Sequence, residues 1–165
     1  LLYPVFPVYF LQTPKEVVMI WAEDHQVRHV YLNQPHSPKP TLSWFGESVG
    51  RYDGDTLVVD TVGLNGRTFV DNFRTPHTDR LHVVERFRMI DGGRTLEAKI
   101  HVEDPGAFTM PWDAVQRYHR IDSASDKSDA RIPHNGLEEM ACAETSGDIL
   151  NEGLESIPHA DRPDF

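Results

Sequence analysis

Acidic side chains fall on the apolar faces of three predicted β-strands. Glu85, Asp104 and Glu23 are each in phase with, or directly extend, the apolar positions of a β-rich segment; these segments are 81–89, 96–102 and 17–21. Alternate side chains of a strand lie on one face of a sheet, so we expect all three carboxylates beside apolar surface. Burying a carboxylate without a partner costs free energy. Each one must therefore be ion-paired, hydrogen-bonded or protonated.

Two interpretations of these carboxylates follow. In the first, Glu85 joins a structural ion-pair network or lies in water at the mouth of a barrel. In the second, a buried carboxylate acts as general acid or base on a bound organic molecule. The sequence offers Arg28, Arg51, Arg86 and His77 as partners for Glu85. A direct pair with the adjacent Arg86 is not expected, because neighbouring residues of a strand point to opposite faces.

Aromatic and loop residues extend the candidate site. His77 lies in a rigid Thr-Pro-His-Thr segment that enters a strand, where it either stabilises the loop or takes part in chemistry. Trp44 and Trp112 either line an apolar pocket or belong to the core. We therefore predict catalytic roles for Glu85, Asp104 and His77, and substrate contacts for Glu23, Arg28, Trp44, Arg51 and Trp112.

Metal and cofactor motifs are missing from the sequence. Nine histidines are present, but they form no HExxH pattern, no Cys cluster accompanies them, and no EF-hand loop or glycine-rich phosphate loop is found. Residues 46–50 match the letters GxSxG, yet they lead into a hairpin instead of a strand–turn–helix, so Ser48 is not expected to be a nucleophile. We predict neither a metal nor a cofactor.

Composition limits the partners of the chain. A formal net charge of −10 argues against binding to a phosphate backbone, which requires a basic excess. The apolar residues 1–11 are interrupted by prolines and are too few to span a bilayer. They also lack the charged start of a signal peptide. Cys142 has no second cysteine to pair with and is interpreted as an inert thiol.

Turn signals between β-rich segments predict an all-β fold. Asp53-Gly54 and Asp91-Gly92-Gly93 are typical of hairpin turns. With the neighbouring β-rich runs they indicate seven or eight strands, arranged as an antiparallel meander that closes into a lipocalin-like barrel. We predict a barrel domain over 1–121, followed over 122–165 by a linker, a short helix at 136–144 and an acidic tail.

A longer motif carries a family resemblance. The run WFGESVGRYDGDTLVVDT at 44–61 resembles a large group of uncharacterised exported bacterial proteins that is frequent in acidobacteria and proteobacteria. The similarity continues in the short motifs PHTD, VERF, EDP and PW, which begin at positions 76, 84, 103 and 111. The resemblance implies a periplasmic or secreted location, but no reaction.

Three functional hypotheses are compatible with these patterns. The first is a barrel that binds a small organic molecule and acts on it by acid–base chemistry, as a lyase, isomerase or hydrolase. The second is a ligand carrier without catalytic activity. The third is a structural or assembly subunit, and self-association of the chain is an expected partner interaction in that case.

Overall fold

The computed structural model describes residues 8–21, 26–71 and 73–120. The chain divides into two compact units, Leu1–Asn135 and Gly136–Phe165, and every described residue belongs to the first. Glu23, Cys142 and the predicted linker, helix and tail of 122–165 lie outside the described residues.

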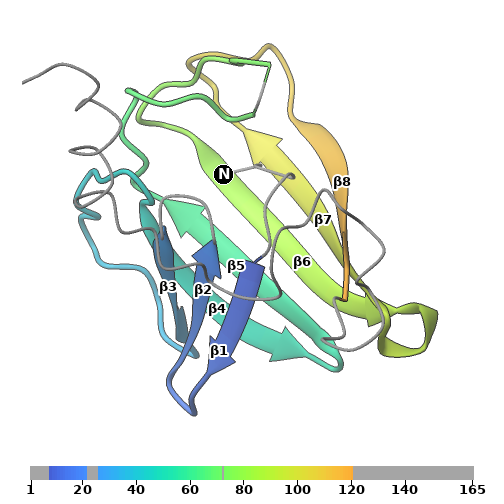
Figure 1. The fold of residues 1–165 in the computed structure, drawn as a ribbon. Helices are drawn as coiled ribbons and strands as arrows, with labels where there is room; N and C mark the ends of the chain where they lie inside the picture. Colours follow the sequence, from blue (N-terminus) through green and yellow to red (C-terminus); the bar gives the residue numbers. More distant parts are fainter. Residues whose placement is uncertain (1–7, 22–25, 72, 121–165) are drawn as a thin grey trace, which may run out of the picture. The chain divides into compact units, whose positions relative to one another are not determined.

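Eight strands form one sheet in which spatial order follows sequence order, as Figure 1 shows. Both the all-β class and the number of strands are therefore confirmed. The strands are β1 (Val8–Gln12), β2 (Glu16–Trp21), β3 (Val27–Leu32), β4 (Glu47–Asp53), β5 (Thr56–Val62), β6 (His82–Ile90), β7 (Thr95–Glu103) and β8 (Trp112–His119).

One strand pair departs from the predicted meander. β3 and β4 are parallel, with Val30 beside Ser48 and Leu32 beside Gly50, whereas all other neighbouring strands are antiparallel. Parallel neighbours need a connection that returns the chain to the starting end of the sheet. The proline-containing segment 33–46 makes this crossover, which the alternation of side chains does not reveal.

The predicted hairpin turns are present. Asp53 pairs with Thr56 across the β4–β5 turn, and Gly54 has φ of 61°, the left-handed conformation that this turn requires. A 3-10 turn, η2 (Asp91–Gly93), connects β6 to β7. No helix in the described part of the chain is both long and apolar enough to cross a membrane.

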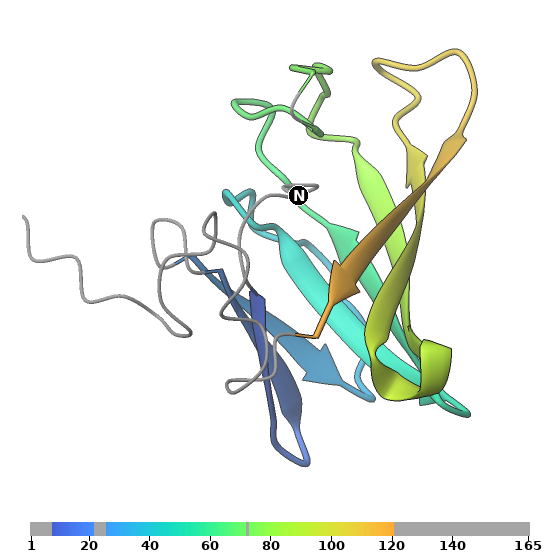
Figure 2. The same cartoon turned by 45° about the vertical axis from the view of Figure 1, so that its right-hand side comes forward.

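The sheet is curled, as the turned view in Figure 2 shows, and the hydrophobic core lies on its inner face. The inner positions of β2 to β7 are mostly apolar, and the central ones include Met19, Val30, Val59 and Ile100. Among the described strands, β1 and β8 pair only with β2 and β7. The described sheet is therefore a half-barrel, and it places the inner side chains of β3 and β6 over the same core.

Candidate functional site

A buried ion pair lies in the middle of the inner face. Arg28 of β3 and Glu85 of β6 are 1% and 3% exposed, and Nη2 of Arg28 lies 2.5 Å from Oε2 of Glu85. Two strands separate β3 from β6 in the sheet. The Arg28 side chain therefore extends across β4 and β5 to reach the carboxylate.

Two hydroxyl groups accept hydrogen bonds from the Arg28 guanidinium between β3 and β6. Nε of Arg28 donates to Oγ of Ser48 at 3.0 Å, and Nη2 donates to Oγ1 of Thr61 at 2.6 Å. Ser48 and Thr61 face each other across β4 and β5, and their oxygens are 2.9 Å apart. The small side chains at these positions leave room for the long one. Four polar residues from four strands thus form a fixed cluster inside an apolar core.

Close approach of β3 to β4 depends on Gly50. A Cβ atom at this position would lie 2.7 Å from Cγ1 of Val30 and 3.3 Å from Cδ2 of Leu32. Those distances are shorter than ordinary contacts, so glycine lets the parallel pair form. The parallel pair in turn brings Ser48 beside the strand that carries Arg28.

The hydrogen bonds of the Arg28–Glu85 pair run through Nε and Nη2 of Arg28 and Oε2 of Glu85. No buried side-chain nitrogen or oxygen in the described part of the chain lacks a hydrogen-bond partner. The phenol of Tyr118, on β8, belongs to the same electrostatic environment. Burial raises the pKa of Tyr118 to about 12; the negative charge of Glu85 contributes to the rise, and Arg28 opposes it. At neutral pH this phenol is therefore a protonated donor.

Asp104 is buried, as predicted, but both of its oxygens are occupied. Oδ2 accepts from the backbone of Thr78 at 2.6 Å, while Oδ1 accepts from the Thr78 hydroxyl at 2.7 Å and the backbone of Gly106 at 2.8 Å. Burial raises the pKa of the carboxyl, but these hydrogen bonds outweigh that effect and lower it overall. Asp104 therefore ties the 104–111 loop to the segment before β6.

His77 links the segment before β6 to the loop that contains Thr68. Nδ1 lies 2.8 Å from the carbonyl oxygen of Thr78, so it carries the proton and donates. Nε2 then accepts from the hydroxyl of Thr68, which is 2.9 Å away. Both ring nitrogens are used within the loops, which fits the stabilising interpretation of this histidine.

The three predicted catalytic residues do not form one cluster. Glu85 pairs with Ile100 across β6 and β7, and Asp104 lies four residues further along. At the rise of a strand this is about 13 Å. Asp104 and His77 are both hydrogen-bonded to Thr78, whereas Glu85 is hydrogen-bonded to Arg28. The structure thus places Glu85 apart from Asp104 and His77, and the catalytic roles of the three residues stay a prediction.

The predicted substrate-contacting residues are also dispersed. Arg51 occupies an outer position of β4 opposite Val58, away from the face of Glu85. Trp44 is 58% exposed, and Trp112 is half-buried on β8, edge-on to Phe108. Of the predicted substrate contacts in the described part of the chain, Arg28 is the one that touches Glu85.

Sequence reasoning missed a row of acids and imidazoles on the outer face. His36 Nδ1 lies 3.0 Å from Glu47 Oε1, and His36 Nε2 lies 2.9 Å from Asp60 Oδ1. His82 Nε2 lies 3.0 Å from the same Asp60 oxygen, and His82 Nδ1 lies 2.6 Å from Glu103 Oε1. We call these five residues the outer row.

A weak signal for the outer row exists in the sequence. Asp60, His82 and Glu103 each alternate with inner apolar residues, which marks them as outward-facing. Their lateral alignment depends on strand register, however, and register is not readable from alternation alone. His36 lies in the crossover segment, where no periodic pattern indicates its direction.

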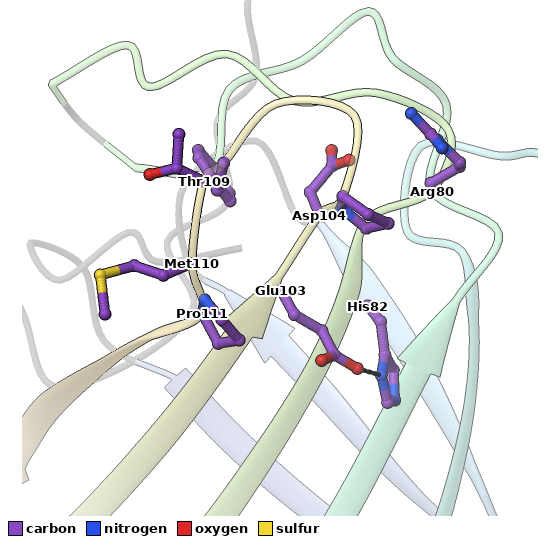
Figure 3. A pocket seen from close by; sticks show the side chains of 9 residues that line it. Arg80, His82, Glu103, Asp104, Thr109, Met110 and Pro111 are labelled. Carbon is purple, nitrogen blue, oxygen red and sulfur yellow. Dashed lines mark hydrogen bonds and ion pairs between the residues drawn. The ribbon is translucent and has the colours of Figure 1, made fainter.

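A pocket of about 400 Å³ opens beside one end of the outer row, and Figure 3 shows its lining. His82 and Glu103 form part of its wall and point toward each other. Arg80 and the 104–111 loop complete it, with Phe108 and Met110 as apolar contributors. In the described ranges, no group of three or more His, Cys, Asp or Glu side chains is arranged to hold a metal ion.

No family model, curated protein or solved structure matches the chain. The resemblance carried by residues 44–61 stays a prediction. The function is therefore argued from the arrangement of side chains.

Proposed function

We propose that this protein binds a small organic molecule on the inner face of the sheet, against the Arg28–Glu85 pair. The observation that carries the proposal is the pair itself. Two opposite charges lie at the centre of an apolar core, held by the hydroxyls of Ser48 and Thr61. The hydrogen bonds seen at the pair in the described residues involve Nε and Nη2 of Arg28 and Oε2 of Glu85.

A purely structural role is a weaker account of the pair. Moving two charges out of water costs free energy that their attraction regains only in part, and apolar residues of similar volume often stabilise a core as well or better. The sheet already has an apolar inner face on both sides of the pair. A need for polar recognition at this point explains why charges are found there.

The chemistry of the cluster suggests the class of ligand. Arg28 and Glu85 together carry no net charge, so an ion would meet no opposite excess. Oε1 of Glu85 is an acceptor, while Nη1 of Arg28 and the phenol of Tyr118 are donors. Met19 and Phe87 belong to the apolar surroundings. An uncharged molecule with a donor and an acceptor close together on an apolar body fits these groups.

Acid–base catalysis is a second candidate, favoured by Tyr118. A phenol whose pKa is raised to about 12 stays protonated, and it can donate to an oxygen on which negative charge develops. Glu85 would then accept the proton that leaves the substrate. Turnover that is lost in both Tyr118→Phe and Glu85→Gln, with a larger loss in kcat than in ligand affinity for Tyr118→Phe, would identify an enzyme.

Thermal-shift screening of the full chain tests the binding proposal. Uncharged aromatic and carbonyl compounds are screened against the wild type, Glu85→Gln and the control Glu16→Gln, whose carboxylate is on the outer face and paired with His29. We expect compounds that raise Tm in the wild type and in the control, with the shift lost in Glu85→Gln. Equal shifts in all three proteins would contradict binding at the pair.

A double variant keeps the test decisive if Glu85→Gln does not fold. Arg28→Met combined with Glu85→Leu removes both charges and leaves neither one unpaired. A folded double variant that still responds to the same compounds would overturn the proposal.

We also propose a periplasmic or secreted location, supported by the resemblance alone. Fractionation of cells that express the native gene tests it.

A further inference from the structure

The histidines of the outer row each face carboxylates with both ring nitrogens. His36 lies between Glu47 and Asp60, and His82 lies between Asp60 and Glu103. A neutral imidazole has one N–H, and an ionised carboxylate can only accept. All four contacts are hydrogen bonds only when both rings carry two protons. Asp60 Oδ1 then accepts from both imidazolium groups.

We propose that the outer row is a pH-operated clasp that fastens the crossover segment 33–46 to the sheet. His36 belongs to this segment, whereas Asp60, His82 and Glu103 belong to β5, β6 and β7. When a ring releases its second proton to solvent, one of its nitrogens presents a lone pair to a carboxylate oxygen. One hydrogen bond of the row is then replaced by a repulsive contact.

The environment of His82 supports a clasp that works near neutral pH. Burial lowers the pKa of His82, but hydrogen bonds to Glu103 and Asp60 and their negative charges outweigh burial and raise it above 6.5. Arg80 lines the same pocket as His82. On β7, His101 occupies the next outer position before Glu103, and its partner is Asp113 of β8. No other charged group is hydrogen-bonded to His82 in the described part of the chain.

Other contacts limit how far the segment can open. The backbone of Ser37 donates to Glu47 at 2.7 Å, and the backbone of Ser43 donates to Gly63 at 3.0 Å. These bonds do not involve an imidazole and persist when the row loses protons. Because Ser37 follows His36 directly, the released part is the His36 side chain and the backbone that precedes Ser37. Because His82 and Glu103 line the pocket, proton loss from His82 also makes its wall more negative by one charge.

Nitrogen NMR of the imidazole rings in the full chain tests the protonation state directly. We expect both nitrogens of His82 to show imidazolium shifts at pH 6, and one of them to lose its proton as the pH rises toward 9. A neutral single tautomer of His82 at pH 6 would overturn the proposal, since the ring would then donate to only one of its two carboxylates.

Amide hydrogen exchange tests the consequence for the crossover segment. Between pH 6 and pH 9, after correction for intrinsic exchange rates, we expect peptides that include residues 33–36 to lose up to about fivefold protection, the effect of one partly exposed ion pair. His36→Gln and His82→Gln should each remove this pH dependence. His101→Gln, which alters an outer-face pair elsewhere, should keep it. Retention of the full pH dependence in both row variants would contradict the clasp.

Discussion

At the scale of single residues, Arg28 connects four strands through its own side chain. It starts on β3, donates to Ser48 on β4 and to Thr61 on β5, and ends at Glu85 on β6. A residue placed this way is costly to disturb, because removing its counter-ion leaves a buried charge without compensation.

Glu85→Gln tests that cost. We expect the free energy of unfolding to fall by about 3–5 kcal/mol, the usual effect of breaking one side of a buried ion pair. The double variant Arg28→Met with Glu85→Leu should lie within about 2 kcal/mol of the wild type, since no charge is left unpaired. Urea unfolding followed by tryptophan fluorescence measures both. A double variant less stable than Glu85→Gln would show that the pair supports the fold.

Asp104→Asn tests the loop function of this carboxylate. The amide cannot accept all three hydrogen bonds, so we expect a loss of about 2 kcal/mol at pH 7. The pKa of Asp104 is lowered in the folded state, so its contribution is complete above the unfolded value near 3.9 and is lost as the pH falls through the folded value. The difference between variant and wild type should shrink below about pH 4. A difference that is constant from pH 7 to pH 2.5 would contradict this assignment.

At the scale of elements, the parallel β3–β4 pair decides which residues meet. It places Ser48 next to the strand of Arg28, and the crossover segment that it requires brings His36 over β5. The pair depends on Gly50, where no side chain fits beside Val30.

Gly50→Ala should therefore weaken the sheet at this pair. We expect a loss of about 1–3 kcal/mol, because the added methyl group overpacks the contact with Val30 and Leu32. Gly54→Asn is the matched control: this turn residue has φ of 61° and open space around it, and asparagine tolerates that conformation. Thermal unfolding of both variants gives the comparison. Equal losses would show that the close approach of β3 to β4 is not limiting.

The outer row makes its own contribution to stability across β5, β6 and β7. The raised pKa of His82 means that its stabilisation is complete below the unfolded value of about 6.5 and is lost as the pH rises through the folded value. We expect His82→Gln to cost about 1 kcal/mol at pH 6 and less at pH 9. Unfolding curves at the two pH values measure the difference. A loss of unfolding free energy in His82→Gln that is larger at pH 9 than at pH 6 would contradict this prediction.

At the scale of the whole molecule, alternation and turn residues predicted the class and most strands of the described unit. The two-residue repeat of 81–89 correctly assigned Glu85 to a buried face, and Asp53-Gly54 correctly marked a hairpin. Pairing between strands that are distant in sequence is not encoded in such local patterns. The sequence could therefore suggest Arg28 as one of four possible partners of Glu85, but it could not identify Arg28 as the actual partner.

The same limit explains why the sequence could not show how the candidate site residues are grouped. Asp104 and Glu85 share an inner phase, yet their separation along the sheet depends on register, and Asp104 is bonded within its own loop. The outer row was missed because its members align only after β5, β6 and β7 are paired. The barrel-like all-β class is confirmed, with the described strands β1 to β8 curled into a half-barrel.

Side-chain NMR of Arg28 during a fragment titration is the most direct test of the central claim. The Nε–H of Arg28 donates to Ser48 beside the proposed ligand position, and its signal responds to any new partner of the guanidinium. We predict that uncharged fragments which raise Tm shift this signal saturably, together with signals of Tyr118. Fragments that bind while both residues keep their free-protein signals would contradict ligand binding at the Arg28–Glu85 pair.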